Sequence, residues 1–370
     1  MSKERIGILF GGKSGEHEVS LVSAASVMKK LNPERFEPVM IGIDRDGRWY
    51  LQTEPKIDTE TNGMILQKGI DTRVYALPGD GLYCNGESLR LSVVFPVLHG
   101  TFGEDGTVQG LLEIADLPYV GAGVLGSSLS MDKATVKRVW MKAGLRVVPF
   151  VLALRQDLYR EDGSRDPEAF AELSGRAEKE YSYPLFVKPS RAGSSVGVTR
   201  VENREELADA MEEAFRYDVK LLIEPEMLGR EIECSVIGNE TQEAFVPGEI
   251  VPTHKFYDYK AKYVDPDGAK LLVPAPLDEL EQEEVKRTAV EAYRAAEAEG
   301  MARVDCFIDK KSGEVYLNEI NTIPGFTGIS MFSKLCEASG LPYPAMLERI
   351  VDLAYARYKT RASLTYQLML

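Results

Sequence analysis

Short apolar runs alternate with helical segments through roughly the first third of the chain. Residues 6–10 form an apolar run that ends at Gly11-Gly12, and residues 92–98 form another that ends at His99-Gly100. This alternation implies a parallel sheet with crossover helices. Ser20 is expected to cap the first helix, because serine favours that position. The expected strands are residues 6–10, 37–43, 48–51 and 92–98, and the expected helices are 20–30 and 109–115.

The rest of the chain continues as mixed α and β structure. Residues 121–126 satisfy G-x-G-x-x-G, but no acidic residue follows about 20 positions on to hold a ribose, so we interpret them as a linker, with Ser130 capping the next helix. We expect three α/β parts, residues 1–128, 129–227 and 228–370. The expected later helices are 132–143, 166–179, 204–217, 280–300 and 344–357; the expected later strands are 150–154, 185–188, 221–224, 232–237 and 244–250; and residues 360–370 are expected to form a frayed tail.

Composition excludes several classes of protein. The 370 residues carry a formal net charge of −14 with no basic patch, so neither a nucleic-acid nor an anionic-membrane partner is expected. The four cysteines are scattered, and they indicate free thiols in a reducing compartment. There is no apolar run of membrane-spanning length, and no signal peptide precedes the first strand, so a cytoplasmic protein is expected. Of the three histidines, His17 and His254 are expected at the surface.

Residues 303–325 carry the most informative chemistry. Residues 306–308 and 315–320 read as two strands joined by a turn at 310–313. Side chains two apart share a face of a strand, so Arg303 lies beside Asp305, and Glu319 lies beside Asn321. The hairpin brings these pairs face to face, and such oxygen ligands suit Mg²⁺. The alternative is a solvated charged hairpin at the surface.

A loop rich in glycine and serine, residues 193–197, supplies the complementary half of a nucleotide site. It follows a strand that ends at Lys188, and a strand is expected to resume at residues 196–201. Small residues let backbone N–H groups approach phosphate oxygens, and Lys188 adds a positive charge. The loop could close over a nucleotide as a flap; the alternative is an ordinary flexible hairpin. Residues 7–14 also match the Walker A pattern, but Gly7 lies inside a strand and acidic residues follow Ser14, so we reject that match.

Six segments, taken in order, resemble the D-alanine–D-alanine ligase family. They are Gly11-Gly-Lys-Ser-Gly-Glu16-His-Glu-Val-Ser20, His99-Gly100 with Gly103-Glu-Asp-Gly106, Met131-Asp-Lys133, Lys188-Pro-Ser-Arg-Ala-Gly-Ser-Ser-Val-Gly197, Phe256-Tyr-Asp-Tyr-Lys-Ala-Lys262-Tyr263 and the block 303–331. The resemblance implies an ATP-grasp fold, in which an N-terminal parallel α/β domain precedes two α+β subdomains that sandwich ATP. It implies an enzyme that joins two D-alanines through an acyl phosphate for peptidoglycan synthesis, releasing ADP and phosphate.

The resemblance also assigns roles around ATP. Asp305, Glu319 and Asn321 would hold two Mg²⁺ ions, with Glu319 bridging them; Mn²⁺ would substitute. Arg303 and the backbone N–H of Gly325 would stabilise the transferring phosphoryl group and the oxyanion. The residues expected to contact ATP itself are Lys133, Lys188 and Ser195 at the phosphates, and Glu224, Met227, Glu231 and Phe256 around the adenosine.

For the amino acids, Glu16 resembles the residue that binds the ammonium of the first D-alanine. Ser194 and Tyr263 resemble its partners in a hydrogen-bonded triad that closes the flap. His99 lies at a strand end, where open α/β sheets place ligands. The residues that resemble the pocket for the second D-alanine are Lys262, Ser330 and Met331.

Some features depart from the pattern or leave the specificity open. Pro225 stands in the adenosine hinge, where it offers no backbone N–H. Residues 45–90 match least, and they could contribute to a homodimer interface. The alternatives are a ligase that joins D-alanine to D-lactate or D-serine, another ATP-grasp enzyme, and a nucleotide-binding protein without catalysis.

Overall fold

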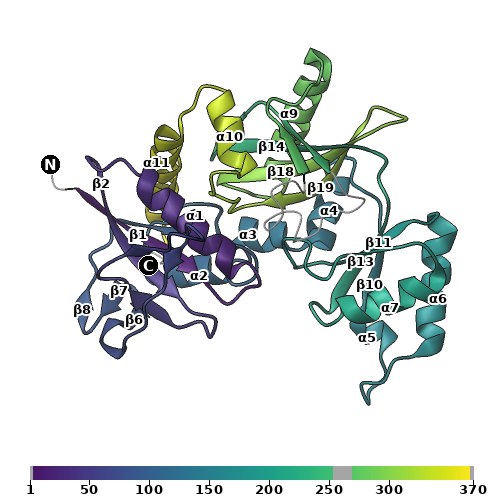
Figure 1. The fold of residues 1–370 in the computed structure, drawn as a ribbon, viewed down its shortest axis with the longest axis horizontal. Helices are drawn as coiled ribbons and strands as arrows, with labels where there is room; N and C mark the ends of the chain where they lie inside the picture. Colours follow the sequence, from purple (N-terminus) through teal and green to yellow (C-terminus); the bar gives the residue numbers. More distant parts are fainter. Residues whose placement is uncertain (1–2, 253–268, 367–370) are drawn as a thin grey trace.

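The computed structural model describes residues 3–252 and 269–366. Three larger sheets with their helices form most of the described structure (Figure 1), and the first and second of these sheets lie at opposite ends of it. The third sheet lies between them, next to helices α3 and α4. None of the helices in the described ranges is long and apolar enough to cross a membrane.

The first sheet has the order β3-β2-β1-β9. Its strands are β1 (Glu4–Gly11), β2 (Phe36–Ile43), β3 (Trp49–Leu51) and β9 (Val93–Pro96). Strand β1 pairs in parallel with β2 and β9, which confirms the predicted parallel sheet. Helices α1 (His17–Lys30) and α2 (Thr107–Ile114) follow β1 and β9.

The predicted helix start at Ser20 is wrong. Helix α1 begins at His17, and Ser20 lies buried inside it. The Ser20 hydroxyl accepts from the backbone N–H of Gly11 at 2.8 Å and donates to the carbonyl of Val97. It therefore ties together the ends of β1 and β9 instead of capping a helix. His17 is also buried, against our expectation, with Nδ1 2.7 Å from the carbonyl of Gly12.

Residues 45–90 form small antiparallel additions to this end of the molecule. Two short sheets and one 3-10 turn lie here, and the sequence predicted none of them. Their elements are β4 (Lys56–Ile57), β5 (Met64–Ile65), η1 (Ile70–Thr72), β6 (Val74–Leu77), β7 (Gly81–Cys84) and β8 (Glu87–Ser88).

The segment predicted as a linker is partly helical. Helix α3 (Val124–Met131) starts inside it, and the expected boundary between residues 128 and 129 falls within this helix. Gly126 packs directly on the backbone of Glu297, where a Cβ would not fit. Helix α4 (Lys133–Lys142) follows at once, and Asp132 caps it by accepting from the N–H of Thr135 at 3.0 Å. Ser130 is therefore not the cap.

The second sheet is antiparallel, with the order β10-β13-β11-β12. Its strands are β10 (Val151–Leu154), β11 (Leu185–Pro189), β12 (Thr199–Val201) and β13 (Lys220–Pro225). Helices α5 (Arg155–Leu158), α6 (Pro167–Glu180) and α7 (Arg204–Ala214) cover one face, with Phe170 and Leu207 in the core between them. Strand β12 begins at Thr199, later than the predicted residue 196.

The third sheet has the order β17-β16-β14-β18-β19, with β15 paired to β14. Its strands are β14 (Gly229–Gly238), β15 (Gln242–Ala244), β16 (Gly248–Pro252), β17 (Ala269–Leu272), β18 (Gly300–Asp309) and β19 (Val315–Asn321). The single strand predicted at 244–250 is therefore wrong, because the chain leaves the sheet between β15 and β16. The helix predicted to end at residue 300 ends earlier, as α9 (Glu279–Ala295), and β18 begins at Gly300.

Two C-terminal helices join the third sheet to the first. Helix α10 (Met331–Ala338) was not predicted, and α11 (Tyr343–Ala362) extends into the region expected to fray. Figure 1 shows α11 running beside the N-terminal sheet, and its residues share one core cluster with those of β1 and β9. This shared core fixes the first sheet relative to the third, and thereby the site that both contribute to.

Candidate active site

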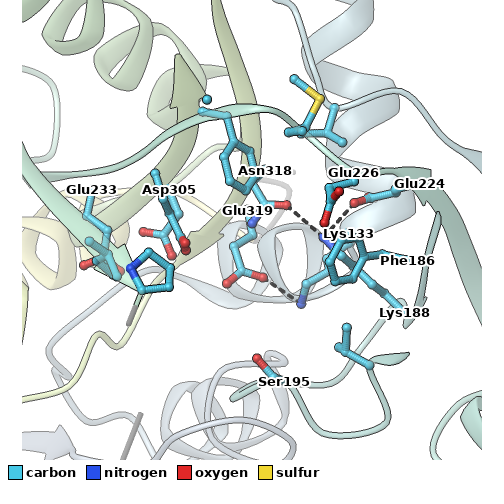
Figure 2. A pocket seen from close by; sticks show the side chains of 18 of the residues that line it. Lys133, Phe186, Lys188, Ser195, Glu224, Glu226, Glu233, Asp305, Asn318 and Glu319 are labelled. Atoms are coloured by element: carbon cyan, nitrogen blue, oxygen red, sulfur yellow. Dashed lines mark hydrogen bonds and ion pairs between the residues drawn. The ribbon is translucent and has the colours of Figure 1, made fainter. Parts of the chain in front are cut away.

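A cleft of about 320 Å³ lies between the second and third sheets. Strands β11 and β13 supply one wall, strands β14, β16, β18 and β19 supply the other, and the loop at residues 192–198 lies across it. Figure 2 shows acidic side chains of the third sheet facing lysines Lys133 and Lys188. The cleft therefore brings carboxylates of the third sheet close to two lysines, the combination that a metal–phosphate site requires.

The hairpin of β18 and β19 has the predicted arrangement. Arg303 lies opposite Asn321, and Asp305 lies opposite Glu319. Two guanidinium nitrogens of Arg303 donate to the two oxygens of Asp305, each at 2.7 Å, and Nδ2 of Asn321 donates to Asp305 at 3.0 Å. Nε of Arg303 also lies 3.1 Å from Glu233 on β14. Burial opposes the charge of Arg303, but Asp305 and Glu233 outweigh it, so its pKa lies well above the usual value.

Lys133 connects helix α4, the hairpin and the flap. Its Nζ lies 3.0 Å from Glu319 and donates to the carbonyl of Ala192 at 2.7 Å. Burial disfavours its charge, yet the attraction of Glu319 wins and raises the pKa of Lys133. In the part of the chain that the structure describes, no group of three histidine, cysteine or acidic side chains could hold a metal. The candidate metal ligands on the hairpin are the carboxylates of Asp305 and Glu319 and the amide of Asn321.

Lys188 lies deeper in the cleft, beside the buried Glu224. Nζ of Lys188 is 2.7 Å from Glu224 and 3.4 Å from Oδ1 of Asn318. Glu224 also pairs with Lys137, which sequence reasoning missed. The signal for it was the spacing from Lys133, because residues four apart share one face of a helix. Glu233 was missed too, although it lies two residues from Glu231 on one strand, and such residues share a face.

The loop at residues 192–198, the expected flap, contacts Glu16, a member of the expected triad. Ser194 and Ser195 have φ values of +50° and +59°, so the loop turns sharply, and the hydroxyl of Ser194 donates to Oε1 of Glu16. Gly193 also packs directly on the Glu16 carboxylate, where a Cβ would not fit. Loops that extend from the second and the first sheet therefore meet at Glu16.

Behind Glu16, buried polar groups join the first sheet to the loop after β19. Nδ1 of His99 lies 2.9 Å from the carbonyl of Ile323, and Nε2 lies 3.0 Å from the hydroxyl of Ser23. Burial lowers the pKa of His99. Glu104 accepts from the backbone N–H groups of Gly100 and Ile323, each at 2.9 Å. Burial, assisted by the charge of Glu16, raises the pKa of Glu104 to about 8. Its place in the Gly103–Gly106 motif was the signal that sequence reasoning left unused.

Gly325, Ser330 and Met331 lie at the entry to α10. The Ser330 hydroxyl accepts from the N–H of Thr327 at 3.0 Å, and a Cβ on Gly325 would lie 2.6 Å from it. Gly325 and Ser330 are thus adjacent, whereas Met331 packs against Gly248 in the third sheet. Glu224, Met227, Glu231 and Ser195 all line the cleft. The expected site residues Phe256, Lys262 and Tyr263, and His254, lie outside the described residues.

Comparison with known proteins gives the same family over nearly the whole chain. The model of the D-ala D-ala ligase N-terminus matches residues 5–122, and that of the D-ala D-ala ligase C-terminus matches residues 139–352. The D-alanine–D-alanine ligase of Treponema denticola is 49% identical over 363 residues, which cover 96% of this chain and 97% of that protein. The relative of the same name from Heliobacterium modesticaldum is 46% identical over 98% of this chain and 97% of its own length.

Solved structures agree. The D-alanine–D-alanine ligase from Coxiella burnetii superposes with a TM-score of 0.81 at 34% identity, covering 98% of this chain and 97% of that one. The VanG D-Ala:D-Ser ligase from Enterococcus faecalis gives 0.80 at 33% identity, covering 95% and 100%. The fold is therefore the ATP-grasp fold that the sequence resemblance implied. This chain is an enzyme of the D-alanine–D-alanine ligase family, and membership implies ATP and D-alanine as small-molecule substrates and the use of a divalent metal.

Proposed function

We propose that this chain joins two D-alanines into D-alanyl-D-alanine at the cost of one ATP, as a step in making peptidoglycan. The observation that carries the proposal is the hydrogen bond from Ser194 to Glu16. Ser194 belongs to the loop that crosses the nucleotide cleft, and Glu16 lies at the carboxyl end of the first sheet. The contact therefore brings the expected phosphate site and the expected amino-acid site together.

The reaction has two steps. A carboxylate oxygen of the first D-alanine bonds to the γ-phosphorus of ATP as the bond to the bridging oxygen breaks and ADP leaves. The amine of the second D-alanine then attacks the acyl carbon, loses a proton and expels phosphate. Arg303 and the backbone N–H of Gly325 stabilise the negative charge that develops in both steps. The closed flap excludes water, which would otherwise hydrolyse the acyl phosphate.

Asp305, Glu319 and Asn321 fit divalent metal ions. Their donors are oxygens, which hard cations prefer, and both carboxylates are already held by the positive charges of Arg303 and Lys133. We propose that these residues would hold two Mg²⁺ ions and that Mn²⁺ would substitute. When bound, such ions neutralise charge on the β- and γ-phosphates.

The remaining cleft residues are assigned to ATP. Lys133, Lys188 and Ser195 contact the phosphates, and the segment from Glu224 to Glu231 holds the adenosine. Within it, Met227 supplies backbone contacts to the adenine and Glu231 binds the ribose. Outside this segment, Phe256 is assigned to stack near the base. The lining of the cleft by Lys133, Lys188, Glu224 and Glu231 supports this assignment.

The amino-acid site is assigned to residues around Glu16. The Glu16 carboxylate binds the ammonium of the first D-alanine, His99 lies beside it, and Tyr263 completes the triad with Ser194. The pocket for the second D-alanine consists of Lys262, Ser330 and Met331. The proximity of Gly325 to Ser330 supports a shared location for the oxyanion and the second substrate.

We also propose a cytoplasmic homodimer and the three domains 1–128, 129–227 and 228–370. A cytoplasmic location fits the free cysteines, because the Cys84, Cys234, Cys306 and Cys336 thiols are all buried and unpaired with one another. The dimer would use residues 45–90, where Ile70 is 87% exposed and Tyr75 is 56% exposed. Size-exclusion chromatography with light scattering tests the dimer, and an I70E/Y75E variant should elute as a monomer if this face pairs.

ATP-dependent phosphate release tests the function. We expect release with Mg²⁺ and D-alanine alone, accompanied by a dipeptide, and none with L-alanine. The second candidate is ligation of D-alanine to D-serine, which the likeness to the VanG D-Ala:D-Ser ligase keeps open. A mixed D-alanyl-D-serine product in excess of D-alanyl-D-alanine would favour it. Turnover with another acid but not D-alanine would contradict the substrate assignment and keep the nucleotide half.

A further inference from the structure

We infer that Lys137 is a positioning residue for the nucleotide: its ammonium holds Glu224 in place and leaves Lys188 able to reach phosphate. This inference rests on the proposed use of ATP in the cleft. Lys137 does not line that cleft, so it acts through Glu224 and not by touching the nucleotide.

The side chain of Lys137 is fully buried. It is 0% exposed and lies on the buried face of α4 between Val136 and Trp140. A lysine in such surroundings is rare unless its charge is paired. Its Nζ donates to the Glu224 carboxylate and, at 3.2 Å, to the carbonyl of Val148. Both contacts point the ammonium at the back of the nucleotide cleft.

Glu224 is shared between two lysines. Its side chain is 1% exposed; one oxygen pairs with Lys137, and the other lies 2.7 Å from Lys188. Lys137 and Lys188 together outweigh the effect of burial and lower the pKa of Glu224. Burial lowers the pKa of Lys137 to about 8, so its charge depends on this carboxylate. The three groups are therefore one unit, with Lys137 inside and Lys188 at the cleft.

The geometry decides what Lys137 contributes. A buried carboxylate with a single partner draws that partner into a tight pair, because it has no water to solvate it. If Lys137 were removed, Glu224 would keep only Lys188 of its two lysine partners. The Lys188 ammonium would then be committed to the floor of the cleft. With Lys137 present, Glu224 holds Lys188 by one oxygen. Asn318 takes a second donor of the Lys188 ammonium, and the third can reach phosphate.

The test is direct binding of ADP with Mg²⁺, measured by titration calorimetry without D-alanine. Lys137→Met keeps the length of the side chain and removes its charge. We expect ADP to bind about tenfold more weakly or worse, as the loss of a charged hydrogen bond implies. Lys142→Met, at the exposed end of the same helix, is the matched control and should bind as the wild type does.

If Lys137→Met alone fails to fold, a second comparison still tests the inference: Glu224→Gln with and without Lys137→Met. Glu224→Gln removes the charge that Lys137 is proposed to hold, so adding Lys137→Met to it should change ADP binding less than twofold. Binding of ADP by Lys137→Met within twofold of the wild type, with only the melting temperature lowered, would overturn the inference and leave a structural role. An equal loss from Lys137→Met with and without Glu224→Gln would also overturn it. Failure of the wild type to bind ADP would instead contradict the proposed function.

Discussion

Glu16 has two roles that one neutral substitution separates. Its carboxylate accepts from Ser194, and its negative charge is assigned to the ammonium of D-alanine. Glu16→Gln keeps an acceptor oxygen for Ser194 but loses the charge. We expect KM for D-alanine to rise about 10- to 100-fold, because a hydrogen bond to a charged group contributes about 1.5–3 kcal/mol.

The matched control for Glu16 lies on the first turn of α1, the helix that begins one residue later. Glu18 is exposed and pairs with Arg45 at the surface, so Glu18→Gln should leave KM for D-alanine unchanged. Steady-state kinetics with saturating ATP separates the two variants. An unchanged KM in Glu16→Gln would mean that another group binds the ammonium.

Arg303 tests the proposed stabilisation of the phosphoryl group. Its planar guanidinium meets Asp305 with two parallel hydrogen bonds, a geometry that lysine cannot reproduce. We expect Arg303→Lys to lower kcat by about 100- to 1000-fold, the usual effect of removing one such donor. Arg349→Lys, which changes an exposed pair with Glu243, should have no effect on kcat. A kcat of Arg303→Lys close to that of the wild type would remove Arg303 from the chemistry.

The sequence predicted correctly the positions of those site residues that contact residues close to them in the chain. The two-residue period of a strand and one short turn were enough to place Arg303, Asp305, Glu319 and Asn321 on one face. The pairing of Lys137 with Glu224 lay beyond such reasoning, although the spacing from Lys133 placed Lys137 on the same face of α4. The two partners are 87 residues apart in the chain, and only the tertiary fold brings them together.

At the scale of elements, the sequence located some helices well, among them the helix expected at residues 166–179, which the structure confirms as α6. Asp166 caps α6 by accepting from the N–H groups of Glu168 and Ala169. Ser20 carries the same signal, yet its hydroxyl binds two strand ends instead. Tertiary contacts decide between these outcomes, and a single sequence does not contain them.

Helix α9 has a complete capping box, which should contribute to stability and not to catalysis. Asp278 accepts from the N–H of Glu281 at 2.8 Å, and the Glu281 side chain accepts from the N–H of Asp278 at 3.1 Å. We expect Asp278→Ala to lower the free energy of unfolding by about 1 kcal/mol. Phosphate release should not change, since neither residue lines the cleft.

The control for this helix is Glu283→Ala, which removes an exposed pair with Lys286 at 3.0 Å. Glu283→Ala should change the free energy of unfolding, measured with urea, by no more than about 0.5 kcal/mol. Equal losses in both variants would show that the capping box adds nothing beyond helix propensity.

At the scale of the whole molecule, the site depends on how three sheets are held together. The sequence predicted the parallel first sheet, because this follows from alternation along the chain. It did not predict how the first sheet meets the loop after β19. That junction depends on Glu104 and His99, which contact residues 219 and 224 positions away.

Glu104 is the buried acceptor at this junction, so its removal should affect catalysis and stability together. Glu104→Ala leaves the N–H groups of Gly100 and Ile323 without their partner, and each unsatisfied buried donor costs about 1–3 kcal/mol. The loop that carries Gly325 starts beside Ile323, so we expect kcat to fall along with the melting temperature. Glu87→Ala, at an exposed site on β8, should change neither. Binding of ADP should survive in Glu104→Ala, because the nucleotide cleft lies between the other two sheets. If kcat stays at the wild-type value while the protein loses stability, the junction holds the fold together without positioning the oxyanion site.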